Sequence, residues 1–201
     1  MKEIGCDVET TGLDPEINEI TELALVYHTG KGVKEFHRLI CPGSFPLNYN
    51  ETVGKITGLT AEKLIAEGIP SPQAHRELLE WLDSIIDRYN KQDKAFMYGY
   101  NVGFDNRFMR SFFKKNNDKY FGSYFFNCKI DVMTVVGMAE ALNVIEPLEN
   151  HRLETVANRL DVKIEAHQAI SDIKATRQIY EKLLLMISQK VTENKLEGNN
   201  E

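Results

Sequence analysis

The sequence predicts an α/β fold in which helices flank a mixed β-sheet. Three strand-like segments come first, and the second and third are separated by Thr29-Gly30-Lys31-Gly32, which is typical of a hairpin turn. From residue 71 onward, helical periodicity alternates with two more strand-like segments. This order predicts an antiparallel meander followed by parallel strands. The five expected strands cover residues 4–9, 20–27, 33–40, 95–100 and 125–130.

Helices are expected where apolar residues recur at helical spacing between turn signals. Ser71 is a suitable N-cap, and Pro72 suits the first helical position. The apolar residues that follow this start are Leu78, Leu79, Leu82, Ile85 and Ile86. Further helices are expected from about Phe104, over 132–142, over 153–160 and over 169–188.

The length of 201 residues and the hydrophobic content of 42% fit one compact domain, placed at residues 1–190. Residues 191–201 are polar and lack periodicity, so they are expected to form a disordered tail. The most apolar run, 183–187, is too short to cross a bilayer, and no secretory signal is visible. The sequence predicts no membrane association.

Cysteine content and charge narrow the class of protein further. Cys6, Cys41 and Cys128 are odd in number and far apart, which predicts reduced thiols in a cytoplasmic protein. The net charge of −6 argues against a protein that coats nucleic acid by charge alone. It is compatible with an enzyme that contacts phosphate through bound cations, because cations in a carboxylate-rich cleft present a positive face.

The first strand carries two carboxylates. Asp7 and Glu9 are two residues apart, so they point to one face, while Ile4, Cys6 and Val8 alternate with them. Neighbouring carboxylates on a partly buried strand repel each other unless one is protonated or a cation lies between them. A solvent-exposed edge with incidental acids is the alternative interpretation.

Three more polar residues are candidates for the same site. Asp105 lies near the start of a helix, where it could instead cap the helix or interact favourably with the helix dipole. His167 and Asp172 are five residues apart across a loop-to-helix boundary, and a surface pair is the alternative. Each signal is ambiguous when it is taken alone.

In combination, these segments resemble the three exonuclease motifs of the DEDDh superfamily. They are Asp-Val-Glu-Thr-Thr-Gly-Leu at 7–13, Asn-Val-Gly-Phe-Asp at 101–105 and His-Gln-Ala-Ile-Ser-Asp at 167–172. That superfamily includes the proofreading epsilon subunit of bacterial replicative polymerase, RNase T and oligoribonuclease. The resemblance covers residues 3 to 185 and implies an RNase H-like fold with a central five-stranded mixed sheet.

The resemblance also implies two divalent cations, Mg²⁺ or Mn²⁺, held by Asp7, Glu9 and Asp172, with Asp105 acting through a water. Such ions prefer carboxylate and water ligands. Two of them would stabilise charge on the entering and leaving oxygens of a phosphodiester. Under the same resemblance His167, with a reference pKa of about 6.5, would accept a proton from the attacking water.

The resemblance further implies how a free 3′ end is held. Backbone groups at Thr10 would contact the 3′-hydroxyl, Leu13, Thr57 and Leu59 would line the terminal base, and Asn101 would also bind substrate. An ordinary turn at 10–14 and a helix cap at Thr60 are the structural alternatives. In the second motif, Tyr100 stands where many relatives have histidine.

The function expected from these motifs is a metal-dependent 3′–5′ exonuclease that acts on single-stranded DNA in proofreading or repair. An RNA 3′-trimming exoribonuclease is the alternative within the superfamily. A non-catalytic nucleic-acid or protein-binding module is the alternative from another class, but degenerate members are expected to lose carboxylates. The expected partners are nucleic acid with a free 3′ end and a polymerase or other replication or repair protein.

Overall fold

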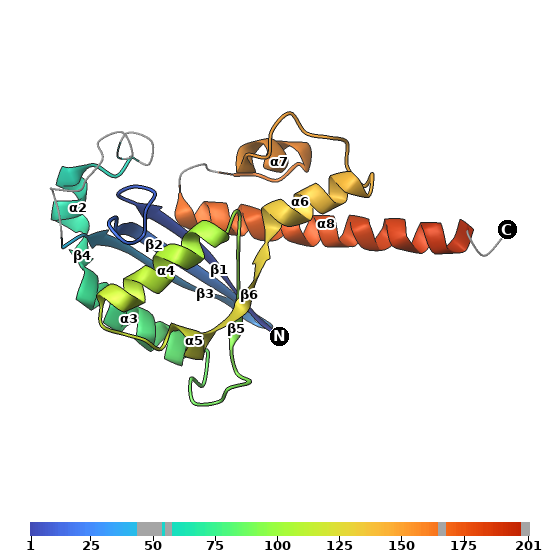
Figure 1. The fold of residues 1–201 in the computed structure, drawn as a ribbon. Helices are drawn as coiled ribbons and strands as arrows, with labels where there is room; N and C mark the ends of the chain where they lie inside the picture. Colours follow the sequence, from blue (N-terminus) through green and yellow to red (C-terminus); the bar gives the residue numbers. More distant parts are fainter. Residues whose placement is uncertain (44–53, 55–57, 165–167, 198–201) are drawn as a thin grey trace.

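The computed structural model describes residues 1–43, 54, 58–164 and 168–197. It is a mixed sheet with helices on both faces (Figure 1). The α/β class and the mixed sheet predicted from the sequence are confirmed. Among the described residues, no helix is long and apolar enough to cross a membrane.

The sheet has six strands in the order β4-β3-β2-β1-β5-β6. β1 pairs antiparallel with β2 and parallel with β5, so the meander and the parallel strands meet at β1. The strands are β1 (Lys2–Thr10), β2 (Ile20–Thr29), β3 (Gly32–Cys41), β4 (Ile69–Pro70), β5 (Ala95–Gly99) and β6 (Phe125–Asp131).

The prediction of five strands was one strand short. β4 contains two residues and pairs parallel with the end of β3, through Ile40 with Ile69 and Cys41 with Pro70. Two residues are too few to produce an alternating pattern, and a proline is expected only at a sheet edge. β4 is that edge, so no strand pattern is visible there in the sequence.

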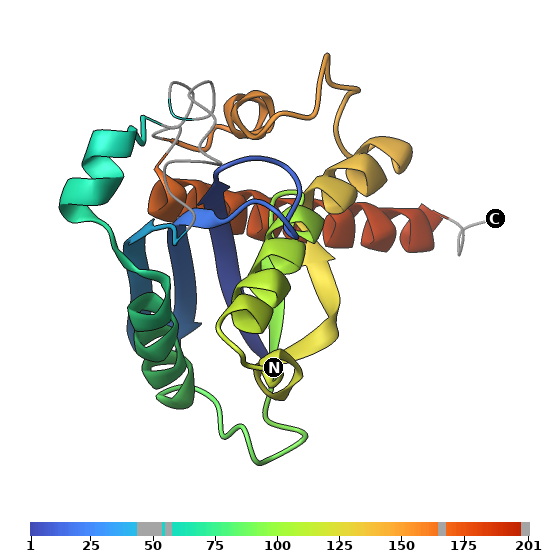
Figure 2. The ribbon, with the colours of Figure 1, turned by 60° about the vertical axis from the view of Figure 1, so that its left-hand side comes forward.

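Two helices cover one face of the sheet and one long helix covers the other (Figure 2). α3 and α4 pack on the face that contains Leu23, Leu25 and Phe36. α8 packs on the opposite face, against β1, β2 and β5. The helices are α2 (Ala61–Glu67), α3 (Ser71–Asp83), α4 (Gly103–Lys115), α5 (Phe121–Tyr124), α6 (Val132–Ala141), α7 (Leu153–Arg159) and α8 (Ala169–Glu197).

Two helix ends differ from the expectation. α8 continues to Glu197, so the disordered tail predicted from residue 191 was wrong for 191–197. Residues 189–197 contain no Gly or Pro and include Gln, Lys, Glu and Leu, which favour helix, and the first glycine comes at 198. At α3, Pro70 occupies the N-cap and Ser71 is the first helical residue, so the start lies one residue earlier than expected.

Candidate active site at the carboxyl end of the first strand

The alternation of β1 places its carboxylates on the face covered by α8. A side-chain Cβ at Gly5 would lie 2.4 Å from Ile173 Cγ2 of α8, so Gly5 faces that helix. Asp7 and Glu9 follow at intervals of two residues and therefore share its face. Ile4, with its even-numbered neighbours, is buried in the core under α3 and α4. Both carboxylates are half-buried, which rules out the solvent-exposed edge considered above.

Asp105 reaches β1 from the start of α4. It lies in the first turn of that helix and is 4% exposed. Its Oδ1 accepts a hydrogen bond of 3.0 Å from the backbone N–H of Val8, which lies between Asp7 and Glu9. The side chain therefore does not cap α4 in the usual way but joins the helix to the strand that carries the other two acids.

Asp172 comes from the first turn of α8, where the helix dipole favours a negative charge. Its backbone N–H donates to the Gln168 carbonyl at 2.9 Å, and its side chain is half-buried. The charge of Asp172 acts on both Asp7 and Glu9. The structure thus brings together the four predicted carboxylates Asp7, Glu9, Asp105 and Asp172.

The electrostatics of this group oppose ionisation. Burial, followed by the charges of Asp105, Glu9 and Asp172, raises the pKa of Asp7 well above its usual range. Burial, followed by the charges of Glu22 and Asp172, raises the pKa of Glu9 to about 7.

The surroundings of Asp105 also oppose its ionisation, but hydrogen bonds offset part of this effect. Burial raises its pKa to about 7, although hydrogen bonds from its own backbone and from Val8 favour the carboxylate. Glu9 and Asp131 add further negative charge nearby. A group of acids whose simultaneous ionisation is unfavourable is typical of a cation-binding or catalytic site.

Glu22 is a fifth acid of the site that the sequence analysis missed. It is the direct cross-strand partner of Glu9 and is 8% exposed. Its Oε1 lies 2.6 Å from His37 Nε2 on β3. The signal was present in the sequence, because Glu22 alternates with Ala24 and Val26, both of which are buried on the α8 face. Only the register between β1 and β2 reveals that Glu22 lies beside Glu9.

The donor chemistry of the site fits hard divalent cations. Mg²⁺ and Mn²⁺ prefer carboxylate oxygens, and a cation among these acids would relieve their mutual repulsion. The side chains do not form a finished cage, since no three His, Cys, Asp or Glu side chains in the described ranges are placed to hold a metal ion directly. Small side-chain rotations or bridging waters would have to complete the coordination. His167, the predicted base, lies outside the described residues.

The last residue of β1 and the loop that follows hold two of the residues predicted to bind substrate. Thr10 is buried, and its hydroxyl donates to the Gly12 carbonyl at 2.6 Å. Thr11 closes the loop, because its N–H donates to the Glu19 carbonyl at 2.9 Å. Leu13 lies at the turn and is 82% exposed, so a large apolar side chain stands in solvent.

The other predicted substrate contacts are more scattered. Leu59 is 3% exposed and lines a cavity of about 410 Å³ that also contains Glu22 and His37. Asn101 has a positive φ of 58°, and its N–H donates to Asp131, which caps α6. Thr60 caps α2, as its structural alternative proposed. Thr57 lies outside the described residues.

Tyr100, which stands where many relatives have histidine, contacts the segment before α7. Its hydroxyl donates to the His151 carbonyl at 2.8 Å, and its ring packs with the cluster under α6 and α7. The substitution therefore joins β5 to the segment before α7.

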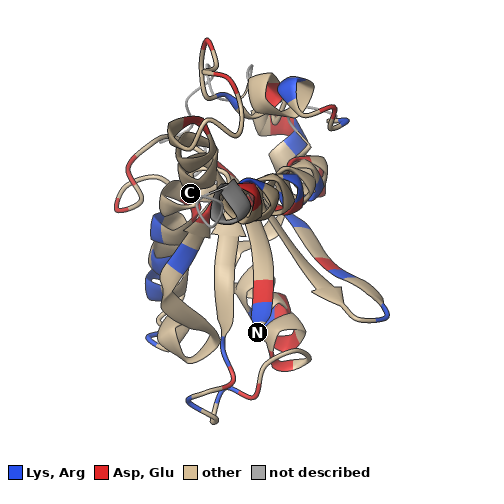
Figure 3. Cartoon of the chain, turned by 90° about the vertical axis from the view of Figure 1, so that its right-hand side faces the viewer, with Lys and Arg blue, Asp and Glu red and all other residues tan. Residues whose placement is uncertain are grey.

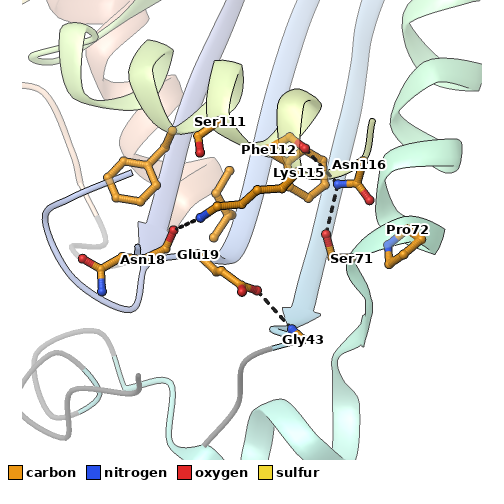
Figure 4. Close-up of a pocket in the computed structure, with 11 residues that line it drawn as sticks. Asn18, Glu19, Gly43, Ser71, Pro72, Ser111, Phe112, Lys115 and Asn116 are labelled. Carbon is orange, nitrogen blue, oxygen red and sulfur yellow. Dashed lines mark hydrogen bonds between the residues drawn. The ribbon is translucent and has the colours of Figure 1, made fainter. Parts of the chain in front are cut away.

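A second cavity, of about 350 Å³, lies on the opposite face of the sheet (Figure 4). It is bounded by Phe108 and Phe112 of α4 and by the end of the loop after β1. Lys115 Nζ donates to the Asn18 carbonyl at 2.5 Å, and the Gly43 N–H donates to Glu19 at 3.0 Å. These bonds fasten the loop that carries Leu13, so we assign the cavity to loop anchoring.

Comparison with known proteins agrees with this arrangement. The model of the exonuclease family matches residues 4–180. The chain is 30% identical over 191 residues to DNA polymerase III PolC-type from Thermotoga maritima, covering 91% of this chain and 12% of that protein. It is 28% identical over 213 residues to the same polymerase from Halalkalibacterium halodurans, covering 96% and 12%. The chain thus spans about an eighth of the length of these relatives.

The solved structures that it resembles include E. coli exonuclease I in complex with a dT13 oligonucleotide. The TM-score is 0.74 at 20% identity, covering 97% of this chain and 43% of that one. A zinc-ion-bound exonuclease I–ssDNA complex gives the same TM-score and identity, with 94% and 41% covered. At this identity the likeness shows the fold. The family model spans most of the chain and all described carboxylates of the site, so this chain belongs to the exonuclease family.

Proposed function

We propose that this chain hydrolyses phosphodiester bonds from the 3′ end of single-stranded DNA, in proofreading or repair. The observation that carries the proposal is the convergence of Asp7, Glu9, Asp105 and Asp172 at the carboxyl end of β1. Two facts about relatives favour DNA over RNA: the PolC-type relatives are DNA polymerases, and the structure of E. coli exonuclease I has been solved with a dT13 oligonucleotide.

Asp7, Glu9 and Asp172 would hold two divalent cations, Mg²⁺ or Mn²⁺, and Asp105 would contribute through a water. When bound, the cations would stabilise charge on the entering and leaving oxygens. Asp105 also fixes β1 against α4 through its bond from Val8. His167 would take a proton from the attacking water, a role open only to neutral imidazole.

Recognition of the 3′ end would fall to the loop after β1 and to the cavity at Leu59. Backbone groups at Thr10 would contact the 3′-hydroxyl, and the exposed Leu13 would lie against the terminal base. Thr57, Leu59 and Asn101 complete the proposed contacts. The expected protein partners are a polymerase or another replication or repair protein, and the expected location is the cytoplasm, where the three free cysteines would stay reduced.

The decisive experiment compares matched single-stranded DNA, duplex DNA and RNA as 5′-labelled substrates, with product lengths resolved over time. We expect a ladder that shortens from the 3′ end of single-stranded DNA, and no cleavage in excess EDTA. A 3′-phosphate should slow digestion strongly, whereas a 5′-phosphate should have little effect. Preference for RNA would move the chain to the trimming alternative. Rapid cutting of circular single strands would contradict end recognition.

A further inference from the structure

Three cations on α4 and β6 keep their charge without a carboxylate partner. Arg107 and Arg110 lie on the exposed side of α4, and Lys129 lies on the exposed part of β6. Within the described part of the chain, none of the three forms an ion pair, whereas other cations do. Those ion pairs include Lys2 with Asp93, Arg38 with Glu77, Lys114 with Glu16, Lys174 with Glu35 and Arg177 with Glu3.

Neutral groups fix the guanidinium of Arg110 in place. Its Nε donates to Asn106 Oδ1 at 3.1 Å, and its Nη2 donates to Asn127 Oδ1 of β6 at 2.9 Å. The guanidinium also lies 4.5 Å from the centre of the Phe121 ring. Amide oxygens and a ring orient the group but cancel none of its charge. Arg110 is therefore a preorganised cation, which lowers the entropy cost of binding an anion.

Lys129 and Arg107 extend this positive surface on either side. Lys129 Nζ lies 3.4 Å from the carbonyl of Asn127, the residue that holds Arg110. Arg107 precedes Arg110 by three residues, which is about 4.5 Å along the helix axis. Figure 3 shows Lys and Arg gathered along α4 and the neighbouring β6. The net charge of the whole chain is −6, so this surface differs in sign from the chain as a whole.

The surface begins at the candidate active site. Asp105, which contacts β1, is two residues before Arg107 on the same helix and points to the opposite, buried side. A strand whose 3′ end lies among the carboxylates has to leave the site over a neighbouring surface. The acids repel its phosphates, whereas the face of α4 and β6 attracts them.

We propose that Arg107, Arg110 and Lys129 form a track for the phosphate backbone of the nucleotides upstream of the 3′ end. The inference rests on the proposed function, since the occupant is the same single strand whose end is hydrolysed. The track reads charge and not sequence, so it sets affinity for long substrates and leaves the chemistry of the last bond unchanged. Lys114 also lies on α4, but it is excluded because Glu16 pairs with it at 2.8 Å.

The test measures binding of a fluorescein-labelled twelve-nucleotide oligo-dT over a range of NaCl concentrations. All proteins carry Asp7→Asn, so that the substrate is not degraded. The test variant combines Arg107→Gln, Arg110→Gln and Lys129→Gln. A charge-matched control combines Lys31→Gln, Lys34→Gln and Lys91→Gln, which are exposed residues away from α4 and β6.

For single strands, each lost phosphate contact should reduce the slope of log affinity against log salt by about 0.7, so the test variant should lose about 2. The control should keep the parental slope. If loss of the Arg110 contacts prevents folding, the double variant Arg107→Gln, Lys129→Gln should still lose about 1.4. An unchanged slope in the folded test or double variant would overturn the proposal, as would equal losses in test and control.

A second measurement separates the track from the proposed function. In the protein with native Asp7, the three track substitutions should leave kcat for a dithymidine substrate unchanged and raise KM for the twelve-nucleotide substrate. Equal loss of dinucleotide turnover would place these residues in the site itself and contradict the track. If no protein cleaves any nucleotide, the proposed function fails while the binding slopes still decide the track. Tighter binding of a polyglutamate peptide than of oligo-dT would assign the surface to an acidic protein.

Discussion

The two faces of the sheet are built from the same strands but serve different ends. Under α3 and α4, residues such as Leu23 and Phe36 form a dry apolar core. Under the start of α8, the same strands present Asp7, Glu9 and Glu22, whose charges oppose one another. Because side chains alternate along a strand, a single register decides both faces. The fold can therefore hold an electrostatically unfavourable site on one face because the other face supplies ordinary packing.

The largest expected effect comes from removing one charge of the site. Asp7→Asn should reduce turnover by more than the loss of the base, for which about 10²–10⁴-fold is expected, because a neutral amide is a poorer ligand than a carboxylate for a hard cation. It should also raise the Tm of the metal-free protein near neutral pH, because the fold disfavours ionised Asp7. Activity assays with thermal unfolding in EDTA measure both. A variant that lost stability together with activity would show that Asp7 is structural.

His167→Ala should separate the base from the metal ligands. Turnover should fall by about 10²–10⁴-fold, while Mn²⁺ should still stabilise the protein, since His167 is proposed to hold no metal. The native rate should rise with pH through the folded-state pKa of His167, and that inflection should vanish in the variant. A pH–rate series and a calorimetric Mn²⁺ titration on both proteins give the answer. Near-native turnover at neutral pH would exclude His167 as the base.

Two neighbouring residues of β2 allow a direct contrast of the faces. Leu23→Ala should lower the free energy of unfolding by about 2–5 kcal/mol, equally with and without Mg²⁺, because it leaves a cavity in the apolar core. Glu22→Gln should instead stabilise the metal-free protein. It removes the charge that raises the pKa of Glu9 most, and it keeps a side-chain oxygen that can bond to His37. Denaturant unfolding with and without Mg²⁺ measures the two. Destabilisation by Glu22→Gln would contradict the repulsion argument.

The pH dependence of stability tests the same face. The folded-state pKa values of Glu9 and Asp105 are about 7, above reference values of 4.5 and 3.8. A raised carboxyl pKa means that stability is greatest below the unfolded value and is lost as pH rises through the folded value. The metal-free protein should therefore lose stability between about pH 4 and 7. Saturating Mn²⁺ should flatten this loss. A metal-free protein that gains stability over this range would contradict the assignment.

The four carboxylates of the candidate site could be located from the sequence because each lies in a local motif. Asp7 and Glu9 depend only on strand alternation, and Asp105 and Asp172 on the position of helix starts. Glu22 could not be assigned to the site from the sequence, because its place beside Glu9 depends on strand register, which is a tertiary property. β4 was not predicted because a strand of two residues is too short to show alternation of polar and apolar side chains. The continuation of α8 to Glu197 was not predicted because a polar helical segment lacks the apolar periodicity that identifies a helix in the sequence.

The smallest expected effect concerns the loop that lies between the two faces. Two adjacent lysines of α4 contact this loop. Lys115 donates to the Asn18 carbonyl, and Lys114 forms a solvent-exposed ion pair with Glu16. Lys115→Met should loosen residues 11–19, speed their hydrogen exchange and raise KM severalfold, because a hydrogen bond to a charged group is worth about 1.5–3 kcal/mol. Lys114→Met is the matched control, since exposed ion pairs contribute about 0–1 kcal/mol. Partial burial lowers the pKa of Lys115, whereas the charges of Glu19, Glu16 and Asp14 in the same loop favour its ammonium form. Equal hydrogen exchange in the two variants would show that α4 does not position the loop.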